Sequence, residues 1–321
     1  MRTLLSGIAA AFVAGALTLS NAAVAGDNLK IMVPANPGGG WDQTGRALGQ
    51  AMQAAGTAKN VRIENRGGAG GTIGIAQFVN SSKGDGDALM VGGLVMVGAI
   101  ELNKSPVTLA QVTPIARLTA EYEVIVVPAG SKFQTLKDLL AAFKANPGAI
   151  AWGGGSAGGV DHILVGLLAK EAGADATKIN YVPYAGGGEA VAAILGGHVA
   201  AGVSGWGEFA PHVTSGKMRA LAVSSPTRLT DAKTVPTLKE SGVNLEVNNW
   251  RGVFGAPGIS AAQRDALIKQ IAATVKSPAW QEVLKRNDWT DVLLTGDQFK
   301  GYIDAEQKRV AGVLKDIGLA K

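Results

Sequence analysis

Four glycine-rich turns constrain the fold of this chain more than any other feature of its sequence. Each turn follows a short apolar run and precedes a segment with helical periodicity, which is typical of a strand–turn–helix unit. The repetition of such units predicts an α/β fold in which mostly parallel sheets are flanked by helices. The turns hold 15 of the 45 glycines and lie at Gly38–Gly40, Gly67–Gly71, Gly153–Gly159 and Gly186–Gly188.

The order of the expected elements divides the chain into two lobes. Two extended runs, 114–119 and 123–127, follow one another without a helix, so we place a crossing into a second lobe there. The first strands have too few helices to cover both faces of their sheet, so the C-terminal helices are expected to return to it. We predict two lobes joined by two crossings with a cleft between them: 26–118 plus 225–321 form lobe 1, and 119–224 form lobe 2.

The first 25 residues are expected to be a secretory signal peptide. A positive start at Arg2 precedes an apolar run from Leu4 to Leu19, and small residues fit a cleavage site after Ala25. A retained signal anchor is the alternative, against which the Ala- and Gly-rich run argues. The chain has no cysteine, which excludes disulfides, thiolate metal ligands and an acylated lipoprotein cysteine. An exported chain without these features best fits a bacterial periplasm.

Glycine turns at the carboxyl ends of parallel strands are suited to bind an anion. Ligands of open parallel sheets bind at that edge, where helix N-termini present free backbone N–H groups. Two such turns facing each other across a cleft would form a clamp for a carboxylate or a phosphate. For each turn, the purely steric use of glycine stays open as the alternative. Lysine and arginine are scattered, so no nucleic-acid surface is expected, and the formal net charge of +5 weakly favours a small anion.

The side chains beside the first and third turns have both a binding and an ordinary interpretation. Asp42 and Arg46 are spaced as a surface ion pair. Trp41 either closes over a ligand or packs beside its helix. Ser156 either donates its hydroxyl hydrogen to an anion or caps the following helix. His162 lies off the buried stripe of its helix, which makes it a candidate for facing the cleft.

Catalytic motifs at the third turn are weighed against the binding interpretation. The G-x-S-x-G pattern at 154–158 fits a nucleophile elbow, and an acid and a histidine follow it, as Glu189 with His198 or Glu208 with His212. An elbow is a sharp turn, however, whereas this loop has five glycines in seven residues. The overlapping G-x-G-x-x-G pattern lacks an acid at the end of the next strand. We expect no catalytic residue, metal or cofactor, and keep a secreted serine hydrolase as an alternative.

At these turns the sequence resembles the substrate-binding proteins of tripartite tricarboxylate transporters, the Bug/TctC family. The resemblance covers the chain after residue 25 in order. Two departures are Asn65–Gly68, where the family commonly has proline before the glycine run, and Ala201, where an acid often follows the Leu-Gly-Gly turn. The matching segments are VPANPGGGWDQTGR (33–46), ENRGGAGGTIG (64–74), WGGGSAGGVDH (152–162), YVPYAGGGEAVAAILGGHVAAG (181–202) and VPTLKESG (235–242).

The resemblance implies a periplasmic two-lobe receptor of the Venus flytrap type that delivers its ligand to a large and a small membrane subunit. It also implies that the first loop and the loop after Trp152 grip a ligand carboxylate through backbone N–H groups and water. The GGGWD and GGGSAGG forms are most similar to the citrate-binding branch, so a di- or tricarboxylate is expected, citrate first.

The far end of the ligand is the least defined part of the expected site. Tyr184, Trp206, Trp250 and Arg251 are candidates there because they lie near loop ends. We expect a monomer, and a receptor that senses ligand for a signalling kinase is a further alternative. The residues predicted to bind ligand are Pro37, Gly38, Gly39, Gly40, Trp41, Asp42, Gly154, Gly155, Ser156, Ala157, Gly158, His162, Tyr184, Trp206 and Arg251.

Overall fold

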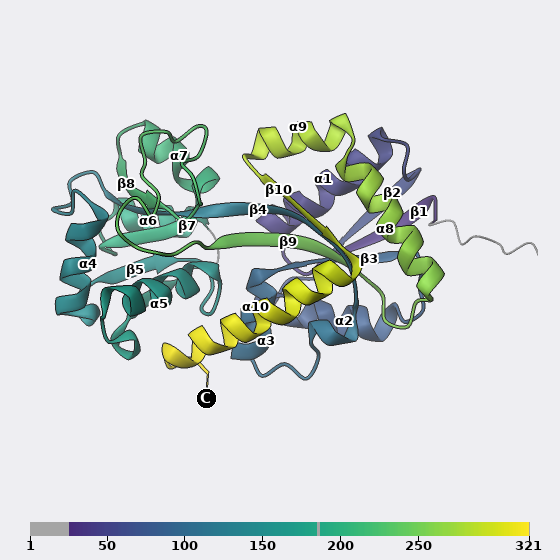
Figure 1. The fold of residues 1–321 in the computed structure, drawn as a ribbon, viewed down its shortest axis with the longest axis horizontal. Coiled ribbons are helices and arrows are strands. Elements are labelled where there is room, and N and C mark those ends of the chain that lie inside the picture. The colour runs from purple at the N-terminus through teal and green to yellow at the C-terminus, as the bar shows by residue number, and fades with distance from the viewer. Residues whose placement is uncertain (1–25, 185–186, 321) are drawn as a thin grey trace, which may run out of the picture.

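The computed structural model describes residues 26–184 and 187–320. The predicted signal peptide lies outside the described residues, as do Ala185 and Gly186 of the fourth glycine turn. The described chain forms two halves connected by long strands (Figure 1). Strands and helices alternate along most of it, which confirms the predicted α/β fold.

Parallel strands begin the first half of the molecule. The central strand β1 (Asn28–Val33) pairs in parallel with β2 (Asn60–Asn65) on one side and with β3 (Ala88–Gly93) on the other. Because all three run the same way, their carboxyl ends, and the glycine turns after β1 and β2, lie at one edge of the sheet. The helices that follow the three strands are α1 (Gly40–Ala54), α2 (Thr72–Ser81) and α3 (Leu94–Leu102).

Two strands connect the halves. The first half of the long strand β4 (Thr113–Pro128) pairs antiparallel with β9 (Asn248–Gly255) and β10 (Thr290–Thr295). Its second half pairs antiparallel with β7 (Ala201–Gly205) and β8 (Met218–Val223). Figure 1 shows β4 and β9 running side by side from one half to the other. The strand order is β2-β1-β3-β9-β4-β7-β5-β6, so the crossings add antiparallel strands between two parallel groups.

The second half repeats the strand–helix pattern. The short strand β5 (Ala151–Gly154) pairs in parallel with β6 (Asn180–Pro183) and with β7. The third glycine turn, which follows β5, therefore lies at a carboxyl edge of the sheet, like the turn after β1. The helices of this half are α4 (Leu136–Ala145), α5 (Val160–Ala172), α6 (Gly187–Leu195) and α7 (Trp206–Thr214).

The chain returns to the first half later than the sequence indicates. The segment 226–247, assigned above to lobe 1, stays with the second half, because Leu238 donates its N–H to the carbonyl of Val223 at 2.9 Å. Ala232 and Val235 are buried in the apolar core of that half. The return begins only with β9 at Asn248. These contacts favour a boundary near residue 248 in place of residue 225.

The C-terminal helices cover the first half and extend across to the second. The helices α8 (Ala261–Val275) and α9 (Pro278–Asn287) pack against α1. The last helix, α10 (Gly296–Asp316), packs on β4, α3 and α5 and thus spans both halves (Figure 1). Within the described part of the chain, no helix has both the length and the apolar character that a membrane crossing requires.

Candidate functional site

The loop between β1 and α1 is held in shape by Asp42. This carboxylate is 3% exposed and accepts the N–H of Gly38 at 2.8 Å. It also accepts a hydrogen bond from Nε of Arg46 at 2.9 Å and one from Nδ2 of Asn65, at the end of β2, at 2.9 Å. The Asp42–Arg46 pair predicted at the surface therefore forms, but its acid is buried and anchors the first glycine loop to the neighbouring strand.

Replacing Asp42 by asparagine should destabilise the protein at neutral pH. Burial alone would raise the pKa of Asp42, but the hydrogen bonds from Arg46, Gly38 and Asn65 outweigh it and hold the pKa below the ordinary value. The carboxylate therefore contributes stability above pH 4 that is lost as the pH falls through the lowered pKa. We expect Asp42→Asn to lower the free energy of unfolding by about 1–3 kcal/mol at pH 7, measured by urea denaturation.

The exposed i,i+4 pair between Lys300 and Asp304, 2.8 Å apart, offers a matched control. Asp304→Asn should change the free energy of unfolding by less than about 0.5 kcal/mol, because exposed pairs are weak. The deficit of Asp42→Asn should shrink as the pH is lowered from 5 towards 2. A deficit that is constant over this range would contradict the role assigned to the charge of Asp42.

Three side chains shape the loop between β5 and α5. Asp161 accepts the N–H of Gly155 at 2.5 Å, and the hydroxyl of Tyr181 donates to the carbonyl of Gly155 at 2.8 Å. His162 accepts the N–H of Gly158 through Nδ1 at 3.3 Å, and its ring stacks on Tyr181 with the centroids 4.0 Å apart. Burial lowers the pKa of His162 to about 4, so its imidazole is neutral and Nδ1 can accept.

The N-termini of α1 and α5 retain donors for a ligand. Among the described residues, no side chain caps either helix. The first helical hydrogen bonds are those of Gln43 to Gly39 and of Ile163 to Gly159, both 2.9 Å long, so the N–H groups before them have no helical acceptor. The positive ends of both helix dipoles lie at the same places. These two termini favour an anion without needing a charged side chain.

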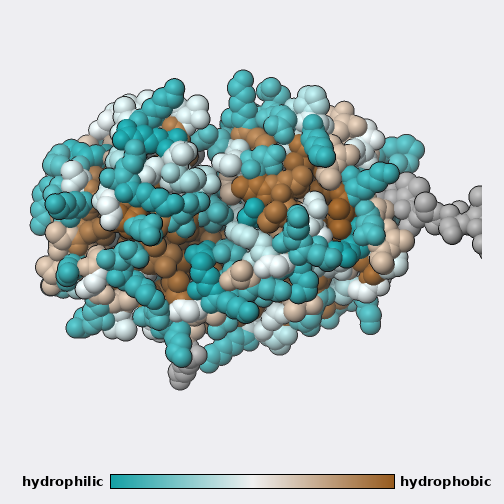
Figure 2. Space-filling view, viewed as in Figure 1, coloured by the Kyte–Doolittle hydropathy of each residue, from teal (hydrophilic) through white to brown (hydrophobic). Residues whose placement is uncertain are grey.

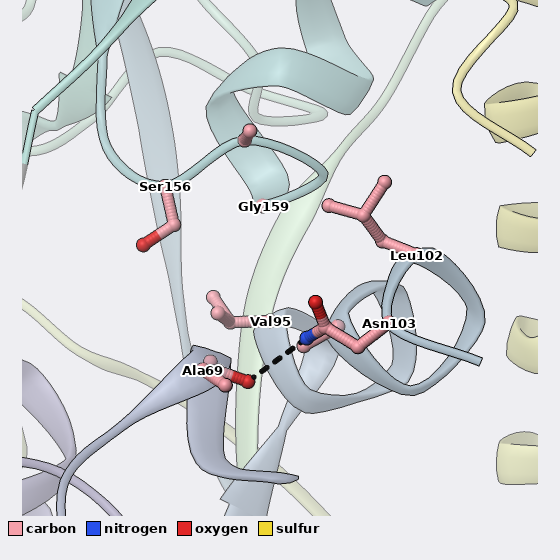
Figure 3. Close-up of a pocket in the computed structure, with 9 residues that line it drawn as sticks. Ala69, Val95, Leu102, Asn103, Ser156 and Gly159 are labelled. Carbon is pink, nitrogen blue, oxygen red and sulfur yellow. Dashed lines mark hydrogen bonds between the residues drawn. The ribbon is translucent and has the colours of Figure 1, made fainter. Parts of the chain in front are cut away.

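A pocket of about 250 Å³ lies between the two halves, beside the second of these loops. Ser156 and Gly159 line it from the second half (Figure 3). Val95 of α3 and Asn103, which follows α3, line it from the first half, and Nδ2 of Asn103 donates to the carbonyl of Ala69 at 3.1 Å. Ala69 begins the short 3₁₀ helix η1 (Ala69–Gly71), which forms part of the second glycine turn. Figure 2, which is viewed as Figure 1 is, shows a notch in the surface between the two halves at the upper edge of the molecule.

The crossing strands place charged groups beside the two loops. Arg251 of β9 is 5% exposed, lies against Gly40 at the start of α1, and is paired with Glu121 of β4. Glu123, two residues further along β4, is completely buried. Glu208 accepts a hydrogen bond from Ser204 at 2.5 Å, and burial raises its pKa. The region between the loops therefore holds several acids and one paired guanidinium.

The structure separates the predicted site residues into two groups. Pro37, Gly38, Gly39, Ser156 and Ala157 are exposed on the two loops. The others are turned inward: Gly40, Gly155 and Tyr184 are half-buried, and the buried residues are Trp41, Asp42, Gly154, Gly158, His162, Trp206 and Arg251. Exposure among the predicted residues is thus greatest at 37–39 and 156–157 of the two loops.

Three aromatic candidates have packing roles. The Trp41 ring lies against Gly71 and Gly93, inside the first half. Trp206 donates its indole N–H to Asp231 at 2.7 Å and belongs to the core of the second half. Tyr184 is half-buried, and its N–H donates to the carbonyl of Gly154 at 2.8 Å. Of the four candidates for the far end of the ligand, Arg251 lies beside the first glycine loop and Tyr184 lies beside the loop that follows β5.

Several residues at the site were missed by sequence reasoning. The turn containing Ala69 was recognised but not assigned to the site, and the helix that carries Val95 and ends before Asn103 was not predicted. Glu121 and Glu123 gave no motif, and Glu121 lies between the two expected extended runs. The structure places both on β4, where a spacing of two puts them on one face.

Neither catalytic motif gains support from the geometry. Glu208, one of the acids weighed for a serine hydrolase, accepts a hydrogen bond from Ser204 at 2.5 Å, and among the described residues neither His198 nor His212 is hydrogen-bonded to Ser156. The described residues contain no group of three or more histidine, cysteine, aspartate or glutamate side chains placed to hold a metal ion.

Comparisons with known proteins agree with this arrangement. Residues 46–319 match the family model described as the tripartite tricarboxylate transporter family receptor. Protein BugT of Bordetella pertussis (strain Tohama I) is 32% identical over 295 residues, which cover 90% of this chain and 89% of BugT. The periplasmic binding protein BugD has a TM-score of 0.77 at 26% identity, covering 92% of this chain and 98% of BugD. Rpa4515 of R. palustris, described with adipate, has a TM-score of 0.79 at 22% identity, covering 91% of this chain and 98% of its own.

Proposed function

The chain belongs to the tripartite tricarboxylate transporter family of receptors, which are binding proteins and not enzymes, and from that premise we propose that it captures a di- or tricarboxylate between its lobes. Citrate is the first candidate. The receptor is exported by its signal peptide, cleaved after Ala25, and delivers the ligand to the large and small membrane subunits of the transporter. Its family includes periplasmic binding proteins such as BugD, with which it shares the fold.

One observation carries this proposal: two uncapped helix N-termini, one from each half, follow exposed glycine loops. The N–H groups of Gly38, Gly155 and Gly158 are already used to shape the loops. The N–H groups that these bonds leave, at Gly39 and Gly40 of the first loop and at Ala157 of the loop before α5, are the ones we assign to ligand carboxylates. Charge-assisted hydrogen bonds of this kind are about twice as strong as neutral ones. A dicarboxylate can engage both loops at once, which favours the two-lobe arrangement over a site on one lobe.

Ligand specificity is proposed from the same geometry. Arg251 is held by Glu121 beside the first loop, so it is placed to add one directed cation to the backbone donors there. Rpa4515, which shares the fold, is described with the dicarboxylate adipate. The pocket beside Ser156 gives space for a ligand group beyond the clamped carboxylate.

Calorimetry of the chain from residue 26 onward tests the proposal. The ligands are citrate, malate, adipate and an aromatic carboxylate, each paired with its uncharged methyl ester. We expect at least one carboxylate to bind and raise the melting temperature, and its ester to do neither. Failure of every carboxylate to bind would overturn the proposal, and equal binding of acid and ester would overturn the assignment of the helix N-termini to carboxylate groups.

A further inference from the structure

Glu123 is a buried acid that the clamp itself does not use. It lies on the crossing strand β4 with no exposed surface. Its backbone is fully bonded: its N–H donates to Oγ of Ser224 at 2.9 Å, and its carbonyl accepts the N–H of Ser224 at 2.8 Å. Neither oxygen of its carboxyl group has a donor among the described residues. A buried carboxylate without a donor is strongly unfavourable, so the group must carry a proton or meet one.

The side chain of Asp161 lies near Glu123, because Asp161 lies against Gly154 and near the carbonyl of Val203 on β7, the strand that pairs with the Glu123 segment of β4. Asp161 is itself 7% exposed and already accepts the N–H of Gly155 at 2.5 Å. Two carboxylates this close in a buried place cannot both be ionised, so the pair holds a proton. The backbone N–H favours a charged Asp161, which assigns the proton to Glu123.

The other ionisable groups around the pair offer no cation to Glu123. Arg251 of β9 is engaged by Glu121 of β4, and Glu208 of α7 brings a further carboxyl group. The Tyr181 hydroxyl of β6 donates to the carbonyl of Gly155, and the neutral His162 of α5 accepts the N–H of Gly158. Burial, followed by the nearby Asp161 and Glu121, raises the pKa of Glu123 well above its ordinary value. Burial also raises the pKa of Asp161, to about 7.

We propose that Glu123 is a positioning residue that stays a neutral carboxylic acid in the folded receptor and donates its hydrogen to Asp161. In this way it holds the glycine loop between β5 and α5 in its ligand-binding shape. The role of this loop in binding rests on the proposed function, but the protonation state of Glu123 can be measured without any ligand. The chain of contacts runs from the crossing strand through Asp161 to Gly155. The loop of one lobe is thereby tied to the element that joins the lobes.

The proton on Glu123 makes stability depend on pH with a definite sign. The unfolded chain releases this proton near the ordinary glutamate pKa, whereas the folded chain keeps it. The contribution of Glu123 is therefore fully present below about pH 4.5 and is lost as the pH rises through the raised pKa. Glu123→Gln keeps a donor and has no proton to lose. Its melting temperature should gain on that of the unmodified protein by about 3 °C for each pH unit as the pH rises from 5 towards the raised pKa of Glu123.

Infrared spectroscopy and amide exchange of ligand-free protein complete the test. The unmodified protein at pH 7 should show a carboxylic-acid carbonyl band that Glu123→Gln lacks, and that the exposed control Glu171→Gln retains. Exchange at Gly153–Gly159 should be unchanged in Glu123→Gln and at least tenfold faster in Glu123→Ala. Absence of the band, or a melting difference that does not vary with pH, would overturn the proposal. Because none of these measurements needs a carboxylate ligand, a failed ligand screen cannot be mistaken for failure here.

Calorimetry with citrate adds the functional measurement. Glu123→Gln should bind citrate within about threefold of the unmodified protein at pH 6, and Glu123→Ala should bind at least tenfold more weakly. If alanine and glutamine bind equally well while the band is present, Glu123 is protonated but does not position the loop, and that part of the proposal fails.

Discussion

Gly98→Val should reduce carboxylate affinity by about 100-fold or more while leaving both halves folded. Gly98 lies on α3, and a Cβ there would overlap the carbonyl oxygen of Gly158 in the glycine loop between β5 and α5. The two elements belong to different halves and are in direct contact. A valine must therefore push the loop of the second half away from the first half. A shift that forfeits two charge-assisted hydrogen bonds, each about 1.5–3 kcal/mol, removes at least two powers of ten in affinity.

A second contact joins the same loop to α3. Gly158 has a φ of +73° and packs against Leu102, near the end of α3. The loop is therefore held on α3 at two places one helical turn apart. Calorimetry with the carboxylate that binds most tightly measures the loss, and circular dichroism with thermal unfolding checks the fold. Overpacking is expected to lower the free energy of unfolding by about 1–3 kcal/mol.

The matched control is Gly301→Val on α10. This glycine is exposed, and a Cβ there meets no atom within 4 Å, so the same substitution should leave affinity unchanged. If Gly98→Val folds and binds the carboxylate as tightly as the unmodified protein does, the contact between α3 and the loop before α5 is not part of the ligand-binding arrangement.

The sequence predicted those elements whose signals are local. The helix α8, for example, begins after Ser260 with a complete capping box to Gln263, a signal contained in four consecutive residues. Parallel strands followed by glycine turns were also found, because the apolar runs are short and the turns are unambiguous. The order of these elements predicted the two lobes, and the family resemblance implied the same architecture.

The elements that were missed depend on distant partners. The strand β9, with the sequence NNWRGVFG, mixes polar and apolar residues, and it forms because β3 and β4 pair with both of its edges. The helix α3 is apolar on nearly every side, so it shows no amphipathic pattern, and the pocket beside it was missed with it. The burial of Glu123 depends on contacts with Ser224 and Asp161, which no local pattern reveals.

The candidate site shows the same division between local and distant causes. The two glycine loops were located from the sequence, and the assignment of their backbone N–H groups to a ligand stays a prediction. The sequence could not show that Asp42, Asp161 and His162 would each occupy one loop N–H. Those bonds reduce the number of loop N–H groups that are left for a ligand. A substitution can remove one of the remaining N–H groups.

Gly39→Pro should weaken carboxylate binding by about 10- to 100-fold, and Gly39→Ala should change it by less than about threefold. Gly39 precedes α1 with a φ of −78°, a value that proline adopts without strain. A Cβ at this position has open space, since the nearest atom is the carbonyl oxygen of Asn36 at 3.9 Å. Alanine and proline both add side-chain atoms, but only proline removes the N–H. The difference between them therefore isolates one backbone donor.

The expected size follows from the strength of a hydrogen bond to a charged group. Such a bond contributes about 1.5–3 kcal/mol, and each 1.4 kcal/mol is a tenfold change in the dissociation constant. Calorimetry of the two variants against the same carboxylate measures the ratio. Because the N–H of Gly39 has no partner in α1, the two variants should unfold at similar temperatures. If Gly39→Pro and Gly39→Ala both bind the carboxylate with equal affinity, the N–H of Gly39 is not part of the clamp. The receptor function would stand, and the donor of the first loop would have to be sought at Gly40 or Trp41.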